Sequence, residues 1–183
     1  SNKANVFDNA TNFSFSGWVK IEDLQNSNIF EIKEGNNYRF NINYYSLASN
    51  GQIRFNVNNS ASGAFSYVSG ANSFVTDWFH YAGVYDGNGA SNTDKFKLYI
   101  NGSPVILTFS GTLPTNMGSL SGNNTINLGN TISSSFQSFD GKASSIQMWN
   151  TSLLQSEVET LYNNGTPYTS TPPQSSNLQF WYK

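Results

Sequence analysis

The carboxylates of this sequence do not form the pair that cleaves a glycosidic bond. That reaction uses two carboxyl groups that face one another across the substrate. The nearest approach to such a pair is Glu31 and Glu34, in Glu31-Ile-Lys-Glu34. Because side chains alternate along a strand, a spacing of three residues sends these two acids to opposite faces. We therefore expect a protein that is not an enzyme.

His80 is the only histidine, and it could act as a general base. Such a base needs a nucleophile beside it. The chain has no cysteine, and no serine nucleophile motif accompanies His80. We therefore expect His80 to be a packed residue of a strand.

Amide, guanidinium and phenol side chains occupy alternate positions along two neighbouring stretches of the chain. Sugars are bound by planar hydrogen-bonding groups together with flat aromatic rings. The residues predicted to bind a ligand are Arg39, Asn41, Asn43, Tyr45, Arg54 and Asn56, with Tyr99 if its strand lies nearby. The sequence thus predicts a carbohydrate-binding face. The alternative is a solvated face without a ligand, because Asn is frequent throughout the chain.

The charge of the chain argues against a polyanion as its partner. The formal net charge is −2 and no basic run occurs, whereas nucleic-acid binding needs a dense patch of Lys and Arg. Charged residues make up 11% and aromatic residues 15% of the chain, a balance that favours strands. The absence of cysteine excludes disulfides and thiolate metal sites. No apolar run is long enough to span a membrane.

Most of the chain alternates apolar and polar residues with a period of two. Phe13 and Phe15 share one face of a predicted strand, and Phe40 and Ile42 share one face of another. Asn-Gly occurs at two of the predicted turns, where it favours tight hairpins. Strands that are buried on one face and joined by hairpins predict an antiparallel β-sandwich. Trp18 has the opposite parity to Phe15, so we expect it at an edge or under a helix.

One stretch has helical spacing instead. Leu154, Val158 and Leu161 recur at intervals of three and four residues. Ser152 with Gln155 fits a capping box. We expect one short surface helix here.

The last part of the chain changes character twice. Residues 166–177 are rich in Pro and Ser and predict a linker. Residues 178–183 are strongly β-prone. We expect a sandwich over residues 1–165, a linker over 166–177 and a terminal strand over 178–183. That strand either reaches back to the sandwich or starts a following unit.

Three blocks of sequence occur in the order seen in a known family. Residues 13–20, FSFSGWVK, are similar to the strand FTISAWVK, and residues 78–87, WFHYAGVYDG, are similar to WHHVAGVYDG. Residues 139–165 are similar to FDGKIDDVRIYNRALSEAEIKALYNGG. In these blocks the chain resembles the laminin-G-like domains of the concanavalin-A-like lectin and glucanase superfamily. The resemblance implies an all-β fold, an antiparallel β-sandwich of the jelly-roll type with one short surface helix. Lectins and glycosidases share this fold, so it does not settle the function.

The resemblance also implies where a metal would bind. Relatives often hold calcium with the paired acids of IDDV, and the corresponding residues here are Ala143-Ser144-Ser145-Ile146. Asp140 and Ser144 occupy the region that the family uses. We expect either no cofactor or one calcium ion, held near Asp140 and Ser144.

These features together predict a non-catalytic recognition module. It would bind carbohydrate or protein as part of a multi-domain protein that is extracellular, on a cell surface or on a virion. Its partners would be a glycan and neighbouring domains or subunits, without nucleic acid and without a membrane span. The alternative is a purely structural domain that decorates a virion or filament and has no ligand.

Overall fold

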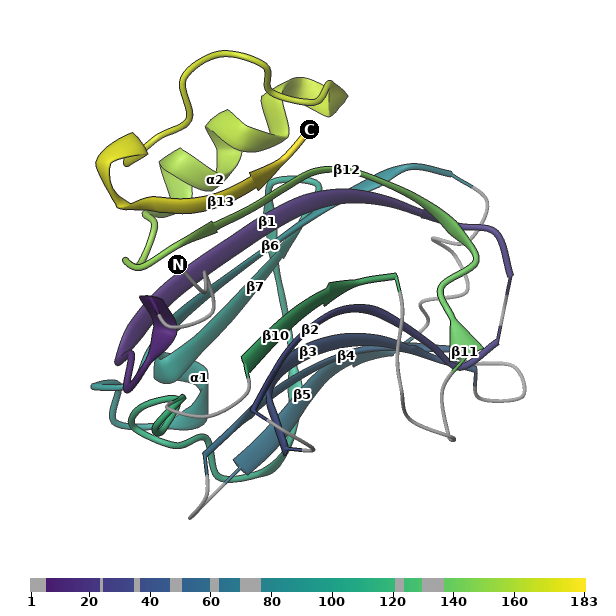
Figure 1. Ribbon diagram of the computed structural model, residues 1–183. Coiled ribbons are helices and arrows are strands. Elements are labelled where there is room, and N and C mark those ends of the chain that lie inside the picture. Colours follow the sequence, from purple (N-terminus) through teal and green to yellow (C-terminus); the bar gives the residue numbers. More distant parts are fainter. Residues whose placement is uncertain are drawn as a thin grey trace.

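Two β-sheets packed face to face make up the body of the protein (Figure 1). The computed structural model describes residues 6–23, 25–34, 37–46, 51–59, 63–69, 77–120, 124–129 and 137–183. Among these residues no helix is long and apolar enough to cross a membrane.

Sheet A has the strand order β13-β12-β1-β6-β7-β8, with every neighbouring pair antiparallel. Its strands are β1 (Asn12–Ile21), β6 (Phe79–Asp86), β7 (Phe96–Ile100), β8 (Ser103–Val105), β12 (Gly141–Trp149) and β13 (Leu178–Tyr182). A short helix, α1 (Asn92–Lys95), precedes β7.

Sheet B has the strand order β10-β2-β3-β4-β5-β9. Its strands are β2 (Ser27–Glu34), β3 (Asn37–Tyr45), β4 (Gln52–Asn58), β5 (Gly63–Ser69), β9 (Thr108–Gly111) and β10 (Asn124–Leu128). The two-residue strand β11 (Gln137–Ser138) pairs with β2 in the parallel sense. The predicted antiparallel β-sandwich is confirmed, with this one parallel pair in the described part of the chain.

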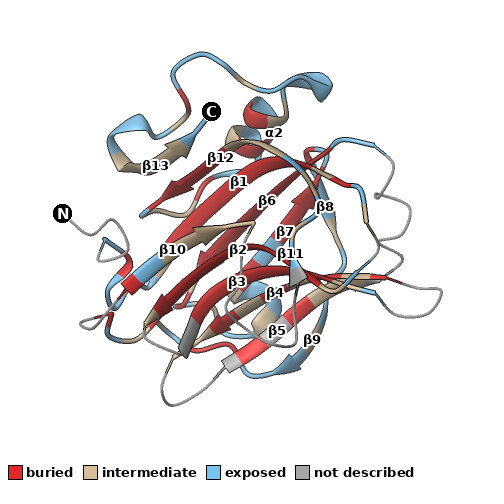
Figure 2. Cartoon of the chain, turned by 45° about the vertical axis from the view of Figure 1, so that its right-hand side comes forward, coloured by how far each residue is buried: buried red, intermediate tan, exposed pale blue. Residues whose placement is uncertain are grey.

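Aromatic rings from both sheets fill the space between them. The ring of Phe15 on β1 lies 4.7 Å from that of Phe40 and 5.7 Å from that of Phe55 on sheet B. Phe96 on β7 stacks on Phe15 from its own sheet at 6.2 Å. The central strands are accordingly buried along most of their length (Figure 2). The period-two alternation of the sequence is therefore the alternation between this core and the outer faces.

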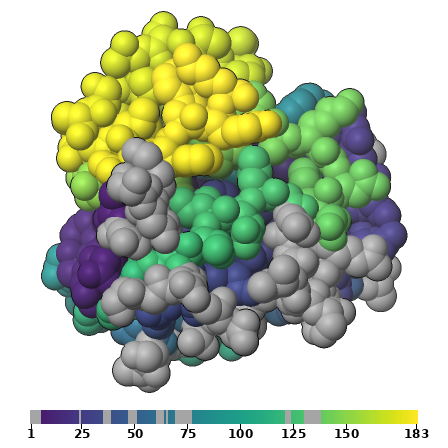
Figure 3. Space-filling model, in the orientation of Figure 1, coloured from purple at the N-terminus to yellow at the C-terminus, as the bar shows by residue number. Residues whose placement is uncertain are grey.

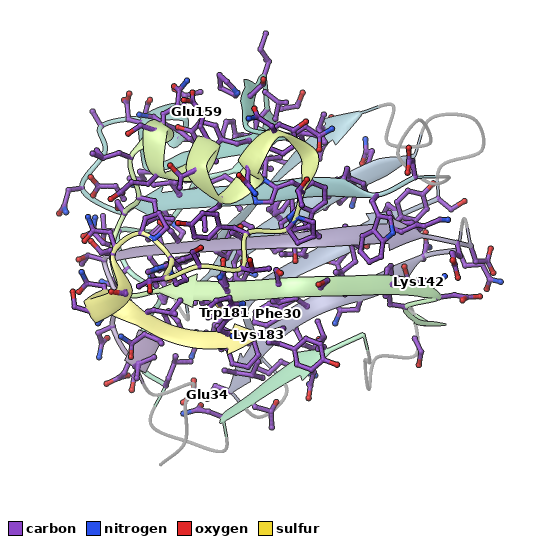
Figure 4. All side chains as sticks on the ribbon, turned by 90° about the horizontal axis from the view of Figure 1, so that it is seen from above. Phe30, Glu34, Lys142, Glu159, Trp181 and Lys183 are labelled. Atoms are coloured by element: carbon purple, nitrogen blue, oxygen red, sulfur yellow. The ribbon has the colours of Figure 1, made fainter. Side chains whose placement is uncertain are left out.

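Helix α2 (Gln155–Tyr162) lies over the outer face of sheet A, as Figure 4 shows from above. The expected helix is present, but the expected capping box was wrong. The helix begins after Leu154, whose backbone N–H donates to the Glu157 carboxylate at 2.8 Å. Ser152 instead donates to the backbone carbonyl of Tyr85 at 2.9 Å. The reason is that Ser152 lies close to β6, where that bond fixes the approach of the chain to the helix.

Trp18 is buried beneath this helix, on the outer face of sheet A. Its ring stacks on that of Tyr162, at the end of α2, with a centroid distance of 5.9 Å. Only 4% of the residue is exposed. The helix therefore buries the second face of β1, which explains why Trp18 is apolar although it points away from the core.

The C-terminal segment returns to its own sandwich. Strand β13 pairs antiparallel with β12, with Phe180 opposite Met148 and Trp181 opposite Gln147. Phe180 and Trp181 are both half-buried. The segment before β13 is held by a hydrogen bond from Trp149 Nε1 to the carbonyl of Pro173 at 2.9 Å. The yellow C-terminal residues thus cap sheet A (Figures 1 and 3).

Candidate functional site

Six of the predicted ligand-binding residues lie on the outer face of sheet B. Strands β3 and β4 are neighbours, and their register places Asn43 opposite Arg54 and Asn41 opposite Asn56. Ile53, Phe55 and Val57 of β4 are buried in the core, whereas the residues that alternate with them are half-buried. The face is therefore built as the sequence predicts, from the outward residues of two paired strands.

A chain of side-chain hydrogen bonds crosses this face from strand to strand. Asn56 Nδ2 donates to Asn43 Oδ1 at 3.0 Å, and Asn43 Nδ2 donates to Asn28 Oδ1 at 3.0 Å. Asn28 Nδ2 then donates to one carboxylate oxygen of Glu31, and Asn127 Nδ2 donates to the other at 2.6 Å. We call these five residues the amide chain. It fixes the orientation of each amide, so the face is rigid before any ligand arrives.

Much of this face is buried rather than solvated. Arg39, Asn41 and Asn43 are 5%, 6% and 3% exposed. Arg39 forms an ion pair with Glu34 and a hydrogen bond to the carbonyl of Ser119 at 3.3 Å. Arg39 Nε and Asn41 Oδ1 are buried and have no hydrogen-bond partner among the residues that the structure describes. Unpaired buried polar atoms cost about 1–3 kcal/mol each, so a face of this kind is unusual for a surface that serves only solubility.

An arginine stacked between two tyrosines forms the more accessible part of the face. The guanidinium carbon of Arg54 lies 3.7 Å from the centroid of the Tyr45 ring and 6.0 Å from that of Tyr67. Arg54 Nε donates to Gln52 Oε1 at 2.8 Å. Tyr45, Arg54 and Tyr67, which we call the Tyr–Arg–Tyr cluster, are all half-buried. Flat rings and a planar cation thus stand beside the amide chain.

Tyr99, the seventh predicted residue, does not join the others. It lies on β7 in sheet A and packs with Trp149, Val158 and Leu161 beneath helix α2. Burial raises its pKa, with a further contribution from the charge of Glu159. The condition that its strand lies near β3 and β4 is not met, because β7 belongs to the opposite sheet.

His80 is a packed strand residue, as expected. It is 1% exposed and shares a hydrogen bond of 2.8 Å with Ser16 through Nε2. The rings of Trp18 and Tyr162 lie 5.4 Å and 5.9 Å from its own. Burial lowers the pKa of His80 to about 3. The pair of Ser16 and His80 is therefore sealed beneath α2, where a substrate has no access.

A polar cavity of about 350 Å³ lies at the end of the sandwich beside Asp140. It is lined by Asp23, Gln25, Ser27, Ser138 and Asp140. Gln25 Nε2 donates to Asp23 at 2.5 Å. Ser27 Oγ is buried and has no hydrogen-bond partner in the described part of the chain. Carboxylate, hydroxyl and amide oxygens are the ligands that calcium prefers. The donor set fits calcium in kind, although no cluster of three acidic, His or Cys side chains occurs among the described residues.

Ser144 lies apart from this cavity. The register of β1 with β12 puts it opposite Trp18, on the outer face of sheet A. The cavity beside Asp140 is lined without it. The structure therefore separates the two residues that were expected to share a metal, and it brings Asp23 to Asp140 instead. The two residues are separated because Ser144 lies within strand β12, whereas Asp140 lies in the loop before it.

Four further residues of the sheet B face were missed in the sequence. Tyr67 comes from β5, Asn28 and Glu31 come from β2, and Asn127 comes from β10. Strand β2 lies next to β3, and β10 lies next to β2. The alternation of polar and apolar residues around Ile32 is visible in the sequence, so the outward direction of Glu31 could have been inferred. The strand order that brings β10 to β2 is not visible, because the two are far apart along the chain.

Comparison with known proteins agrees with this architecture. Residues 1–159 match a laminin-G-type model described as the concanavalin A-like lectin/glucanases superfamily. No curated protein sequence matches the chain.

Solved structures of similar fold come from several sources. A heptameric SAP-like pentraxin from Limulus polyphemus is 18% identical, with a TM-score of 0.62, and the match covers 85% of this chain and 71% of that one. A putative carbohydrate binding protein from Bacteroides ovatus is 17% identical, with a TM-score of 0.59, over 95% of this chain and 45% of that one. The enzymatically active domain of bacteriophage CBA120 tailspike protein 2 is 10% identical, with a TM-score of 0.61, and the match covers 95% of this chain and 26% of that one.

At these identities the solved structures show the fold alone, and the chain spans less than half the length of the last two. The family assignment rests instead on the sequence model, which covers most of the chain from its first residue. The strand order and the buried aromatic core are consistent with it. The chain belongs to the concanavalin A-like lectin/glucanases superfamily.

Proposed function

We propose that this domain is a non-catalytic module that binds carbohydrate on the outer face of sheet B. The observation that carries the proposal is the stack of Arg54 on Tyr45, at 3.7 Å, beside the amide chain. A sugar ring offers an apolar face that packs on an aromatic ring and hydroxyl groups that both donate and accept hydrogen bonds. The Tyr–Arg–Tyr cluster and the neighbouring amides supply both kinds of contact.

The face is long but only part of it is accessible. Tyr45 lies six positions after Arg39 along β3, which corresponds to about 20 Å of strand. The outward residues between these two, Asn41 and Asn43, are amides. Because Arg39, Asn41 and Asn43 are almost fully buried, the direct contacts of a short oligosaccharide fall on the half-buried residues Tyr45, Arg54 and Asn56.

Glu31 and Glu34 were expected on opposite faces, but an irregularity of β2 between Ile32 and Lys33 brings Glu34 to the outer face as well. The contacts of the two acids support a role in binding rather than catalysis. Both oxygens of Glu31 accept amide N–H groups, and Glu34 is paired with Arg39. Within the described residues both acids are thus engaged by protein groups, whereas glycoside hydrolysis requires two carboxyl groups that face the substrate. The fold shared with the putative carbohydrate binding protein from Bacteroides ovatus supports the same assignment by analogy.

The setting of the domain is part of the proposal. The similar structures include a phage tailspike and a pentraxin, and this chain covers only part of the tailspike. We place the domain in a larger extracellular, cell-surface or virion protein. A calcium ion between Asp23 and Asp140 would stiffen the end of the sandwich near the cavity of about 350 Å³.

A glycan array tests the central proposal. The wild-type domain is compared with Arg54→Ala and with Lys97→Ala, an exposed cation on sheet A that serves as the control. Arg54→Ala is expected to lose binding by about tenfold or more, because it removes the stacked cation, and Lys97→Ala is expected to bind normally. If the wild-type domain binds no glycan, or if both variants bind like the wild type, the proposal is wrong.

A further inference from the structure

The Tyr–Arg–Tyr cluster has a geometry that selects among sugars. Tyr45 covers one face of the Arg54 guanidinium at 3.7 Å, and Tyr67 lies at 6.0 Å. The five N–H donors of a guanidinium point outward in its own plane. A stacked guanidinium therefore presents its donors at the rim of the stack, where a planar carboxylate accepts two of them in parallel.

The position of Arg54 is fixed by its neighbours. Gln52 Oε1 accepts the Nε–H of Arg54 at 2.8 Å and so sets the rotation of the guanidinium. Asn43, directly opposite Arg54 in the register, is held between Asn28 and Asn56. A donor fork that is ordered in advance loses less entropy when an anion binds.

The charges of this face are placed unevenly. The face carries two of the nine basic residues of the chain, Arg39 and Arg54. Its acids are Glu31 and Glu34, so these four formal charges balance. Glu31 is fully buried with both oxygens bonded to amides, and Glu34 is paired with Arg39. Of these four charged groups, the guanidinium of Arg54 is the one that lies in the half-buried, more accessible part of the face, beside Tyr45 and Tyr67.

We propose that the Tyr–Arg–Tyr cluster binds the carboxylate of an acidic sugar. This inference rests on the proposed function and names its ligand class. The carboxylate pairs with the guanidinium of Arg54, and the ring that bears it packs against Tyr45 or Tyr67. A neighbouring sugar lies beside the accessible end of the amide chain, where its hydroxyl groups meet the half-buried Asn56.

The test uses matched pairs of immobilised glycans. Each pair consists of a uronic-acid or sialic-acid oligosaccharide and the same compound after reduction of its carboxyl group to an alcohol. The wild-type domain is expected to bind the acid of at least one pair about tenfold more tightly than its reduced form, since one charge-assisted pair is lost. High salt is expected to weaken binding of the acidic glycan and to leave binding of its reduced form unchanged.

Variants connect this preference to the cluster. Arg54→Gln is expected to bind the acid and its reduced form equally, and Arg54→Lys is expected to keep part of the preference, since it keeps the charge but loses the fork. The comparison of glycans in the wild-type domain needs no variant, so it stands even if a variant does not fold.

The outcomes separate the two proposals. Binding of reduced and acidic forms with equal affinity overturns the acidic ligand and leaves the carbohydrate-binding function intact. If the Arg54→Gln variant still prefers the acidic glycan, the carboxylate binds elsewhere and the inference is also overturned. Selective binding of sulfated glycans without carboxylates has the same consequence. Absence of binding to every glycan overturns both proposals.

Discussion

At the scale of single residues, burial decides what His80 can do. A histidine in water has a pKa of 6.5, and burial beneath α2 lowers the pKa of His80 to about 3. The imidazole is therefore neutral in the folded protein over the whole physiological range. Its neutral ring hydrogen-bonds Ser16 and packs against Trp18.

This shift predicts a loss of stability in mild acid. Below pH 6.5 the unfolded chain takes up a proton on His80 that the folded chain refuses, so stability falls as the pH drops from 6.5 towards 3. At pH 5 the loss amounts to about 2 kcal/mol. The free energy of unfolding of the wild type and of His80→Gln, measured in urea at pH 7 and pH 5, gives this contribution as a difference.

The comparison removes the effects of other groups, such as Asp94, whose pKa is lowered by hydrogen bonds with Ser91. His80→Gln is expected to lose less stability between the two pH values than the wild type. An equal loss in both proteins would contradict the assigned shift.

Gly83 is a second residue whose identity is set by packing. A Cβ atom at this position would lie 2.1 Å from the Phe15 ring. Gly83→Ala is therefore expected to lower the free energy of unfolding by about 3 kcal/mol, because the core is overpacked. Phe15→Leu is expected to cost less in the Gly83→Ala background than in the wild type, which a thermal-unfolding double-mutant cycle measures. Additive effects would show that the ring is not the obstacle.

At the scale of elements, the strands were predictable and their partners only in part. The alternation of polar and apolar residues located β3 and β4, and the turn between them indicated that they are neighbours. Asn41 and Asn56 could therefore be assigned to the same outer face. Tyr99 shows the limit, since alternation gives a side chain's face but not the sheet to which its strand belongs. Ser144 shows a second limit, because similarity to a motif gives a position in the sequence and not the direction of a side chain.

Strand β13 is expected to contribute to the stability of sheet A. Leu178 and Phe180 are half-buried and pack against the two apolar clusters of the domain. Truncation after Asn177 is expected to reduce the free energy of unfolding by about 3 kcal/mol, since it exposes both side chains and the edge of β12. The measurement is thermal unfolding of the truncated and complete chains. An unchanged melting temperature would mean that β13 adds nothing to the fold.

The next prediction concerns calcium binding in the cavity between Asp23 and Asp140, at one end of the sandwich. Calcium is expected to raise the melting temperature, and Asp140→Asn or Asp23→Asn is expected to abolish the rise, because each removes one carboxylate ligand. Glu157→Gln, on helix α2, is the control for a lost carboxylate elsewhere. A calcium effect that survives both Asp variants would place the ion at another site, and the absence of an effect would exclude it.

At the scale of the whole molecule, the fold follows from the sequence more readily than the site. The core needs only apolar residues at alternate positions, and Phe15, Phe40 and Phe55 satisfy that condition in any sandwich of this type. The site depends on the order of strands in sheet B, which joins Glu31 to Asn127 across 96 positions of sequence. Such long-range pairing has no local signal, so the amide chain became visible only in three dimensions.

The most direct measurement of the central claim is an NMR titration of the isotopically labelled domain with the glycan that it binds. The side-chain amide signals of Asn43 and Asn56 and the Nε–H signal of Arg54 report from the outer face of sheet B, whereas the indole signals of Trp18 and Trp149 report from sheet A. The account predicts shifts that are largest for the Asn43, Asn56 and Arg54 signals and small for both indoles. Shifts concentrated at the indoles, with the sheet B signals unchanged, would contradict it.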